Sequence, residues 1–329
     1  MLCAVVEDLS EVAGVEVETT WDSRLGNSPF GNIRAVCVES PTEEPQIFRR
    51  LAAACDATLL IAPEFQGILS GRCRIVEEAG GRLTGPSSRA VALCSDKLLL
   101  AAHLREAGIE TISTRPVDWL QVLPPLAQNA PTTFPMVVKP RDGAGSQSTF
   151  LVKDADELAR LSATPARMIR HKYVQQPYVA GTPVSVGLII APSGTDAEVF
   201  PPANQILSDD GRFRYLGGQI PLDQLDHRAV QRAAQSACHS VAGLRGYVGV
   251  DLIVPDRAPD RPVVVEINPR LTTSYLGYRQ MTDDNLAERI LTPACFQRPI
   301  SWRAGSVTFD CAGNVRAASN AHRYLHIAK

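Results

Sequence analysis

The chain has 329 residues, of which 45% are hydrophobic and 21% are charged, and its formal net charge at pH 7 is −2. These values are typical of a globular protein that is long enough for two or three compact units. A net charge this close to zero gives no reason to expect a nucleic acid or an anionic membrane as a partner, so any function that depends on charge must be local. We therefore expect neither a nucleic acid nor a membrane among its partners.

The start of the chain does not resemble a secretory signal. Glu7, Asp8 and Glu11 stand where a signal peptide needs a basic start and an apolar run, and no segment approaches the length of a membrane span. The eight cysteines include no Cys-x-x-Cys pair, which favours reduced thiols in buried positions over a zinc site or a disulfide framework. We expect a cytoplasmic protein.

The first ninety residues alternate between helical and strand patterns, which predicts a small α/β unit with a parallel sheet. We expect this N-terminal domain to span residues 1–92. Units of this kind usually begin with a strand, so either a strand precedes this sequence or the unit departs from the usual order. The predicted elements are a helix over 2–9, a strand at Val15–Thr19, a helix over Glu43–Ala54, a strand at Ala57–Ala62, a helix over Ile68–Ala79 and a short strand at Arg82–Thr84.

The middle of the chain begins with a predicted helix over Asp96–Ala107, for which Ser95 is the expected N-cap. From Met136 the pattern changes to a strand, a glycine-rich loop and a second strand, which predicts a hairpin. Asp154 and Glu157 have the spacing of a capping box at the head of a short helix. Further predicted elements are a strand near Ile109–Ile112, an extended segment over Lys172–Val179, a turn at Gly181–Pro183, a strand over Val184–Ile190 and a helix from Ala229 to Val241.

Two apolar strands late in the chain carry the most informative pattern. Gly249–Val254 is followed by a turn-rich segment and then by Val263–Arg270. With Val254 opposite Val263, a hairpin sets Asp251 across from Glu266, and Asn268 lies two residues further along the same face. Two facing acids repel unless a cation lies between them, so this register predicts a Mg²⁺ site. The alternative is a hairpin with a solvated acidic face, which the unbroken valine runs disfavour.

Lys139 ends an apolar strand and stands four residues before Gly143, in the glycine-rich loop. Its ammonium and the backbone N–H groups of the loop can face the same anion, which predicts a phosphate site. The loop joins two strands and lacks the Gly-Lys-Ser/Thr of a P-loop. The alternative is a flexible turn with a lysine in solvent.

Two weaker signals gain weight from their order along the chain. Lys97 begins a capped helix, although most such lysines are solvated. Gln175–Val179 could form an adenine hinge in which backbone groups of Gln176 and Val179 contact the base edge while Tyr178 walls the ring. The alternative is a strand with an exposed pair of glutamines.

Taken in order, these motifs resemble the ATP-grasp superfamily of carboxylate-amine ligases, and their details are most similar to its tyramine-glutamate ligase group. The resemblance implies an α/β (α+β) fold in which a Rossmann-like N-terminal domain precedes two α+β subdomains that clamp ATP. The glycine-rich loop would belong to residues 93–178 and the metal site to residues 179–329. The motifs are Lys97, Lys139, Asp142–Ser146, Gln176-x-Tyr178-Val179-x-Gly181, Asn204-Gln205, Tyr215–Gly218, Asp251 and Glu266–Ser274.

The resemblance also implies roles for single residues. Lys97 and Lys139 would hold the phosphates of ATP, and Lys139 and Arg270 would act in catalysis on the transferred phosphoryl group. The remaining implied residues are Gly143, Gly145 and Ser146 in the loop over the phosphates, Gln176, Tyr178 and Val179 at the adenine, Asp251, Glu266 and Asn268 on two Mg²⁺ ions that Mn²⁺ can replace, and Asn204, Thr272 and Thr273 at the substrate.

The substrates implied are a small-molecule carboxylate, such as an amino acid like glutamate, and an amine. We expect Thr272 and Thr273, together with Tyr275, Tyr278 and Arg279, to line the acceptor side, unless these residues form a loop packed beneath it. The family also allows a homodimer.

Two positions depart from the family pattern. Pro183 stands where many members carry an acid that holds the ribose, which puts the ribose contact in doubt. Gly249 stands where D-alanine-D-alanine ligases carry an arginine, which argues against that activity.

The activity implied is ADP-forming amide synthesis through an acyl phosphate. Two alternatives stay open: a phosphotransferase on the same scaffold, and a regulatory protein that binds ATP without turnover.

Overall fold

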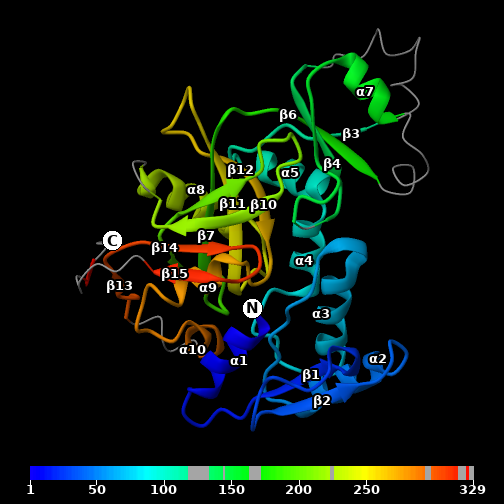
Figure 1. Cartoon of the computed structure of the whole chain (residues 1–329), viewed down its shortest axis with the longest axis vertical. Helices are drawn as coiled ribbons and strands as arrows, with labels where there is room; N and C mark the ends of the chain where they lie inside the picture. The colour runs from blue at the N-terminus through cyan, green and yellow to red at the C-terminus, as the bar shows by residue number, and fades with distance from the viewer. Residues whose placement is uncertain are drawn as a thin grey trace.

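The computed structural model describes residues 1–117, 133–143, 145–162, 172–222, 226–292, 298–317 and 324–325. In these residues the strands form one eight-stranded sheet, one four-stranded sheet and two sheets of two strands each. In Figure 1 the N-terminal unit, in blue to cyan, extends from the lower centre to the lower right, the four-stranded sheet lies at the upper right, and the eight-stranded sheet occupies the centre. None of the described helices is both long and apolar enough to cross a membrane.

The N-terminal unit is built as an α/β unit, as predicted, but its sheet is smaller than expected. β1 and β2 pair in parallel. The strand predicted at Val15–Thr19 overlaps β1, which begins three residues later than predicted, at Glu18. The segments predicted as strands at 57–62 and 82–84 do lie side by side in parallel, yet they pair only at Thr58 and Leu83. The elements are α1 (Leu2–Ser10), β1 (Glu18–Asp22), η1 (Ser23–Leu25), β2 (Arg34–Val38), α2 (Glu44–Ala54), η2 (Phe65–Gly67), α3 (Ile68–Glu78) and α4 (Ser88–Ser95).

The apolar side chains of those two short segments explain why they resemble strands in the sequence. Leu60 and Ala62 pack against the cluster that buries Leu69, Cys73 and Val76 of α3. These apolar side chains are therefore buried by contact with a helix. A hydrophobic run of this kind does not require a long strand.

The next helix, α5 (Lys97–Glu106), is capped by Asp96 and not by Ser95. The Asp96 carboxylate accepts hydrogen bonds from the backbone N–H groups of Leu98 and Leu99. Ser95 is the last residue of α4, and its hydroxyl donates to the carbonyl of Val91 within that helix. Asp and Ser are both good N-caps, so only the preceding helix decides between them.

The four-stranded sheet has the antiparallel order β3-β6-β4-β5 and contains the predicted hairpin. The capping signal beside it is confirmed, because Asp154 accepts from the backbone of Glu157 and Glu157 accepts from the backbone of Lys153. The strand predicted at Ile109–Ile112 is reduced to a bridge between Thr111 and Val264. The elements are β3 (Arg115–Pro116), β4 (Met136–Pro140), β5 (Phe150–Val152), α7 (Ala155–Ser162) and β6 (Tyr173–Pro177).

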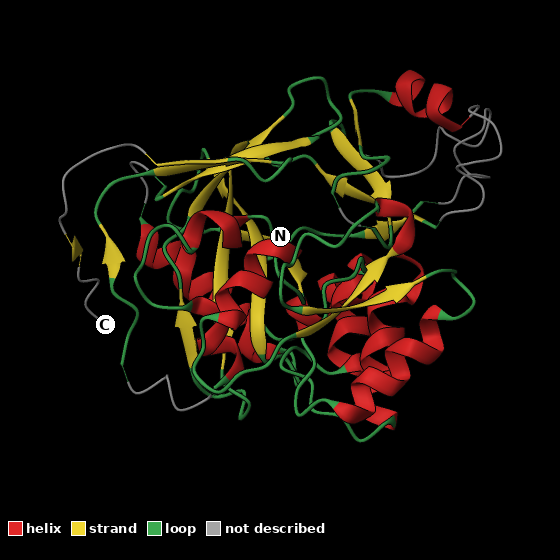
Figure 2. Cartoon of the chain, turned by 60° about the horizontal axis from the view of Figure 1, so that its bottom comes forward, coloured by secondary structure: helices red, strands yellow, loops and turns green. Residues whose placement is uncertain are grey.

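The eight-stranded sheet runs β12-β11-β7-β9-β10-β14-β15, and β8 pairs with β7. Helix α8 contacts one face and α9 the other. Figure 2 shows helices, in red, beside the yellow strands at the centre of the molecule. The elements are β7 (Gly181–Ile190), β8 (Ala197–Val199), β9 (Ala203–Leu207), β10 (Tyr215–Ile220), α8 (His227–Ser240), β11 (Gly246–Pro255), β12 (Val263–Asn268), α9 (Ser274–Tyr278), α10 (Leu286–Leu291), β13 (Trp302–Arg303), β14 (Val307–Asp310), β15 (Val315–Ala317) and β16 (Tyr324–Leu325).

The turn predicted at Gly181–Pro183 is wrong, because these residues open strand β7 and pair with Val254 and its neighbours on β11. A Cβ on Gly181 would lie 2.3 Å from the carbonyl oxygen of Val254. The glycine therefore allows a close approach of two strands, and it does not mark a reversal of the chain.

The central strand β7 of the eight-stranded sheet is buried on both faces over most of its length. Val184, Val186 and Leu188 of β7 pack with α8, whereas the opposite face meets an aromatic cluster around Phe200 and Tyr278. A Cβ on Gly187 would come within 2.9 Å of three aromatic side chains of that cluster. Burial on both faces fixes the strands that carry the candidate site.

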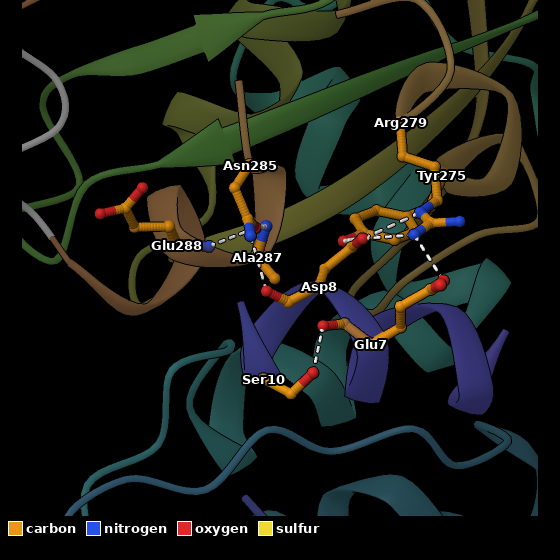
Figure 3. Close-up of polar contacts among 8 residues, drawn as sticks. All are labelled: Glu7, Asp8, Ser10, Tyr275, Arg279, Asn285, Ala287 and Glu288. Atoms are coloured by element: carbon orange, nitrogen blue, oxygen red, sulfur yellow. Dashed lines mark hydrogen bonds and ion pairs between the residues drawn. The ribbon is translucent and has the colours of Figure 1, made fainter. Parts of the chain in front are cut away.

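Helix α1 is joined to α9 and α10 by a buried acid (Figure 3). Asp8 accepts a hydrogen bond from the Tyr275 hydroxyl, at 2.5 Å between the oxygens, and pairs with the Arg279 guanidinium. Its backbone carbonyl accepts from the side chain of Asn285, which caps α10. Tyr275 and Arg279 were expected at the acceptor side, and the structure places them in this anchor instead.

We predict that Asp8→Asn lowers the free energy of unfolding by about 3 kcal/mol, because it leaves the half-buried Arg279 without its closest counter-charge. Urea denaturation followed by circular dichroism measures this change. Glu7 also pairs with Arg279, but its side chain is 62% exposed. Glu7→Gln is therefore the matched control, for which we expect less than about 1 kcal/mol. Equal losses in the two variants would contradict the anchoring role of Asp8.

Candidate functional site

A cavity lies between the four-stranded and the eight-stranded sheets and is lined by residues of both. Of the predicted site residues, Asn204 and the three residues Tyr275, Tyr278 and Arg279 expected at the acceptor side are not among those that line it. The predicted residues that line it are Lys97, Lys139, Gly143, Gly145, Ser146, Gln176, Tyr178, Val179, Asp251, Glu266, Asn268, Arg270, Thr272 and Thr273.

The two acids face each other across the β11-β12 hairpin, in the predicted register. Asp251 is opposite Glu266, and Asn268 is opposite Gly249. The predicted pairing of Val254 with Val263 is wrong. A bulge at Val265, the residue before Glu266, leaves Val265 without a partner on β11 and sets Val263 opposite Ile253. Val265 and Glu266 both line the cavity, since the bulge redirects side chains that would otherwise alternate.

The electrostatics of the acidic pair differ between its two members. Burial, together with the neighbouring Glu266 carboxylate, raises the pKa of Asp251 to about 7. Burial acts in the same direction on Glu266, but the ammonium groups of Lys97 and Lys139 outweigh it and hold the pKa of Glu266 below its usual range. Of the two acids, Asp251 is therefore the one that takes up a proton first as the pH falls.

The donor set around Asp251 fits a hard divalent cation. Asp251 accepts from the amide nitrogens of Gln205 and Asn268, each at 2.9 Å, so the amide oxygen of Asn268 is the atom left for a metal. Among the described residues no cluster of three His, Cys, Asp or Glu side chains occurs. Two carboxylates, one amide oxygen and further oxygens from water or a bound phosphate make the coordination typical of Mg²⁺.

Two lysines place positive charge beside these acids. Lys97 opens α5, donates to the carbonyl of Gly143 at 3.0 Å and lies 3.4 Å from a carboxylate oxygen of Glu266. Lys139 is 8% exposed, and its burial lowers the pKa of its ammonium to about 8, with Glu266 opposing the shift. Both side chains line the cavity together with the glycine-rich loop, an arrangement that can bind a polyanion.

The predicted adenine hinge is only partly as expected. The Gln176 side chain is buried and donates to the hydroxyl of Thr114, so it is not one of an exposed pair. The backbone N–H of Tyr178 already donates to the carbonyl of Pro135. The ring of Tyr178 stacks on Phe213, with 6.2 Å between ring centroids, and both rings line the cavity.

Phe213 was missed in the sequence analysis. It has a positive φ of 54° and stands in the polar connection between β9 and β10. The sequence offers no strong signal for it, because a single aromatic residue in a polar connection is common on protein surfaces.

At the substrate end, Asn204 is not among the described residues that line the cavity, whereas its neighbour Gln205 is. Alternate residues of a strand face opposite sides, so a shift of one residue along β9 reverses the side that a residue faces. Glu64, which lies 2.9 Å from the Nε atom of Arg270, was also missed.

Gly249 and Thr272 meet closely at this end. A Cβ on Gly249 would lie 2.4 Å from the methyl carbon of Thr272, whose hydroxyl bonds to those of Tyr247 and Ser274. No larger side chain fits at position 249 beside that threonine. Pro183, the other departure from the family pattern, lines the cavity as well.

Comparison with curated proteins finds tyramine–L-glutamate ligases among the relatives. The protein from Methanocaldococcus fervens is 27% identical over 241 residues, which are 73% of this chain and 66% of that protein. The protein from Methanocaldococcus jannaschii is 26% identical over 270 residues, which are 80% of this chain and 72% of that protein. The match thus spans about two thirds of the first relative.

Solved structures share the fold at low sequence identity. The L-amino acid ligase from Bacillus licheniformis is 18% identical with a TM-score of 0.70, and the match covers 93% of this chain and 76% of that one. The biotin carboxylase from Campylobacter jejuni, in complex with an ATP analogue, is 16% identical with a TM-score of 0.76, covering 92% and 71%. These likenesses confirm the predicted fold.

The models of two domain families also match the chain. Residues 15–91 match the pre ATP-grasp domain, and residues 94–274, more than half of the chain, match the ATP-grasp domain. The protein therefore belongs to the ATP-grasp family.

Proposed function

We propose that the protein is an ATP- and Mg²⁺-dependent ligase that forms an amide bond between a carboxylate and an amine. The observation that carries the proposal is the convergence in one cavity of an opposed acidic pair, two lysines and an arginine. Two further findings support it. The tyramine–L-glutamate ligases are named for this type of reaction, and a carboxylase domain that shares the fold was crystallised with the magnesium salt of ADP.

In this proposal, Asp251, Glu266 and Asn268 hold two Mg²⁺ ions, which Mn²⁺ can replace and which would neutralise the charge on the phosphates of ATP. Lys97 and Lys139 bind the same phosphates. The loop with Gly143, Gly145 and Ser146 closes over them and excludes water. Gln176, Tyr178 and Val179 contact the adenine, with Phe213 behind Tyr178.

The chemistry follows from positioning and charge. An oxygen of the substrate carboxylate attacks the γ-phosphorus, the bond to ADP breaks, and an acyl phosphate forms. The amine then attacks the acyl carbon and phosphate leaves, which gives an amide. Lys139 and Arg270 stabilise the negative charge on the transferred group, so no nucleophile from the protein is needed.

The proposed substrates are small molecules: an amino acid such as glutamate as the carboxylate, and a separate amine. Thr272 and Thr273 contact them at the end of the cavity beside Arg270. The domain bounds 1–92, 93–178 and 179–329 and a homodimer belong to the same proposal.

A screen of paired substrates tests the function. We expect ADP and free phosphate to appear only when a carboxylate and an amine are both present, with an amide product seen by mass spectrometry. ADP without free phosphate would indicate a phosphotransferase. Nucleotide binding with no ADP from any pair would indicate a regulatory protein, and either outcome would contradict the ligase.

We predict that Glu266→Gln lowers the rate of ADP formation by at least about a hundredfold, because it removes a negative charge from the pair that would hold the metal. ADP release measures the loss, and circular dichroism checks that the fold is intact. Asp260→Asn is the matched control, since it removes an exposed acid from the turn of the same hairpin. Unchanged ADP production by Glu266→Gln would remove this residue from the mechanism.

We also predict that nucleotide binding takes up a proton at about pH 9. The pKa of Lys139 is lowered to about 8 in the free protein, against 10.5 for an ordinary lysine. Bound phosphates favour the ammonium form and raise this pKa, so a neutral Lys139 is protonated on binding above pH 8. Below that pH it is already protonated, and uptake vanishes.

Calorimetric titration in two buffers of different ionisation enthalpy measures this uptake. Lys139→Arg is the control, because arginine keeps its proton throughout this range. The same proton uptake in that variant would assign the titration to another group.

A further inference from the structure

Glu64 connects the N-terminal unit to the arginine of the candidate site. It immediately precedes η2 and is 4% exposed, and its Oε1 atom lies 2.9 Å from the Nε atom of Arg270, whose side chain is 20% exposed. The Nη1 atom of Arg270 donates to the carbonyl of Leu271 at 3.1 Å. Within the described part of the chain, no hydrogen bond is found for Nη2, which leaves this donor for a bound group.

This contact is not arranged for maximum stability. In the described residues, the second oxygen of Glu64 is buried without a hydrogen-bond partner, and Nε of Arg270 is close to Glu64 without hydrogen-bond alignment. A buried carboxylate oxygen that lacks a donor costs free energy of folding. Local rules are broken in this way mostly at functional sites, where another interaction compensates.

The backbone beside Glu64 is strained as well. Gln66 has a φ of 55°, in the left-handed region that residues other than glycine rarely adopt. Its backbone N–H donates to a carboxylate oxygen of Asp142 at 2.9 Å, at the start of the glycine-rich loop. One turn of the N-terminal unit thus contacts both Arg270 and the base of the loop.

We propose that Glu64 is a positioning residue, which fixes the guanidinium of Arg270 so that its free edge faces the transferred group. This rests on the proposed function, in which Arg270 contacts that group. An arginine side chain has many rotamers, and ordering it before the substrate binds removes this cost from the reaction step. The N-terminal unit thereby completes a site whose other charged residues come from helix α5 and from the two sheets and the segment that follows β12.

A double-mutant cycle on ADP formation tests the proposal. We expect Glu64→Gln to lower kcat by about ten- to a hundredfold while the Kd for nucleotide is unchanged, because a misplaced group loses rate more than binding. In an Arg270→Met background, the same change should have no further effect, since Glu64 acts only through Arg270. Glu64→Asp keeps the charge and should recover part of the rate. Additive effects would overturn the proposal.

The matched control is Glu44→Gln, which breaks an ion pair with Arg72 inside the same unit, and should leave kcat unchanged. A comparable loss in this control would mean that Glu64→Gln acts through the stability of the unit, and would also overturn the proposal.

A spectroscopic readout keeps the proposal separate from the proposed function. In protein labelled with ¹⁵N-arginine, the Nε–H signal of Arg270 is assigned by its absence from Arg270→Met. We expect this signal to shift and to exchange faster with water in Glu64→Gln, but not in Glu44→Gln. An unchanged signal in Glu64→Gln would refute the positioning role, even if no substrate pair yields ADP.

Discussion

The repulsion between two carboxylates on neighbouring strands is the constraint on which the candidate site depends. Asp251 and Glu266 are held opposite each other, because β11 and β12 are paired and their neighbouring residues Val250, Leu252, Val264 and Ile267 are packed in the core. Their negative charge is instead met by Lys97 and Lys139 from outside the hairpin, and by the amide groups of Gln205 and Asn268. The rigid core thus creates a demand for positive charge that a divalent cation meets well.

Three separate parts of the chain supply the charged groups of the candidate site. Lys139 comes from the four-stranded sheet, the acids come from the eight-stranded sheet, and Glu64 reaches the site from the N-terminal unit. No single part contains a complete set of charged groups. Relative placement of the three parts therefore matters as much as the chemistry of any residue, which is expected where catalysis rests on positioning.

The sequence predicted what depends on local pattern or on the order of motifs. The opposed acids, the hairpin with the glycine-rich loop and helix α8 follow from periodicity, and the family follows from the order of the motifs. The bulge at Val265 could not be predicted, because three consecutive valines at 263–265 give no alternation whose interruption would mark it. The sequence could not distinguish Asn204 from Gln205, because only the tertiary fold determines which face of β9 lines the cavity. Glu64 is far from Arg270 in the sequence, and no local signal joins them.

The tight contact between Gly249 and Thr272 has a consequence for the evolution of this end of the cavity. Bulk at one position excludes bulk at the other, since a Cβ at 249 would overlap the methyl group of the threonine. A descendant that gained a long side chain at 249 would first have to shed that methyl group. Positions 249 and 272 should therefore diverge together. A change of ligand preference at this end of the cavity would need substitutions at both positions, with the one at 272 first.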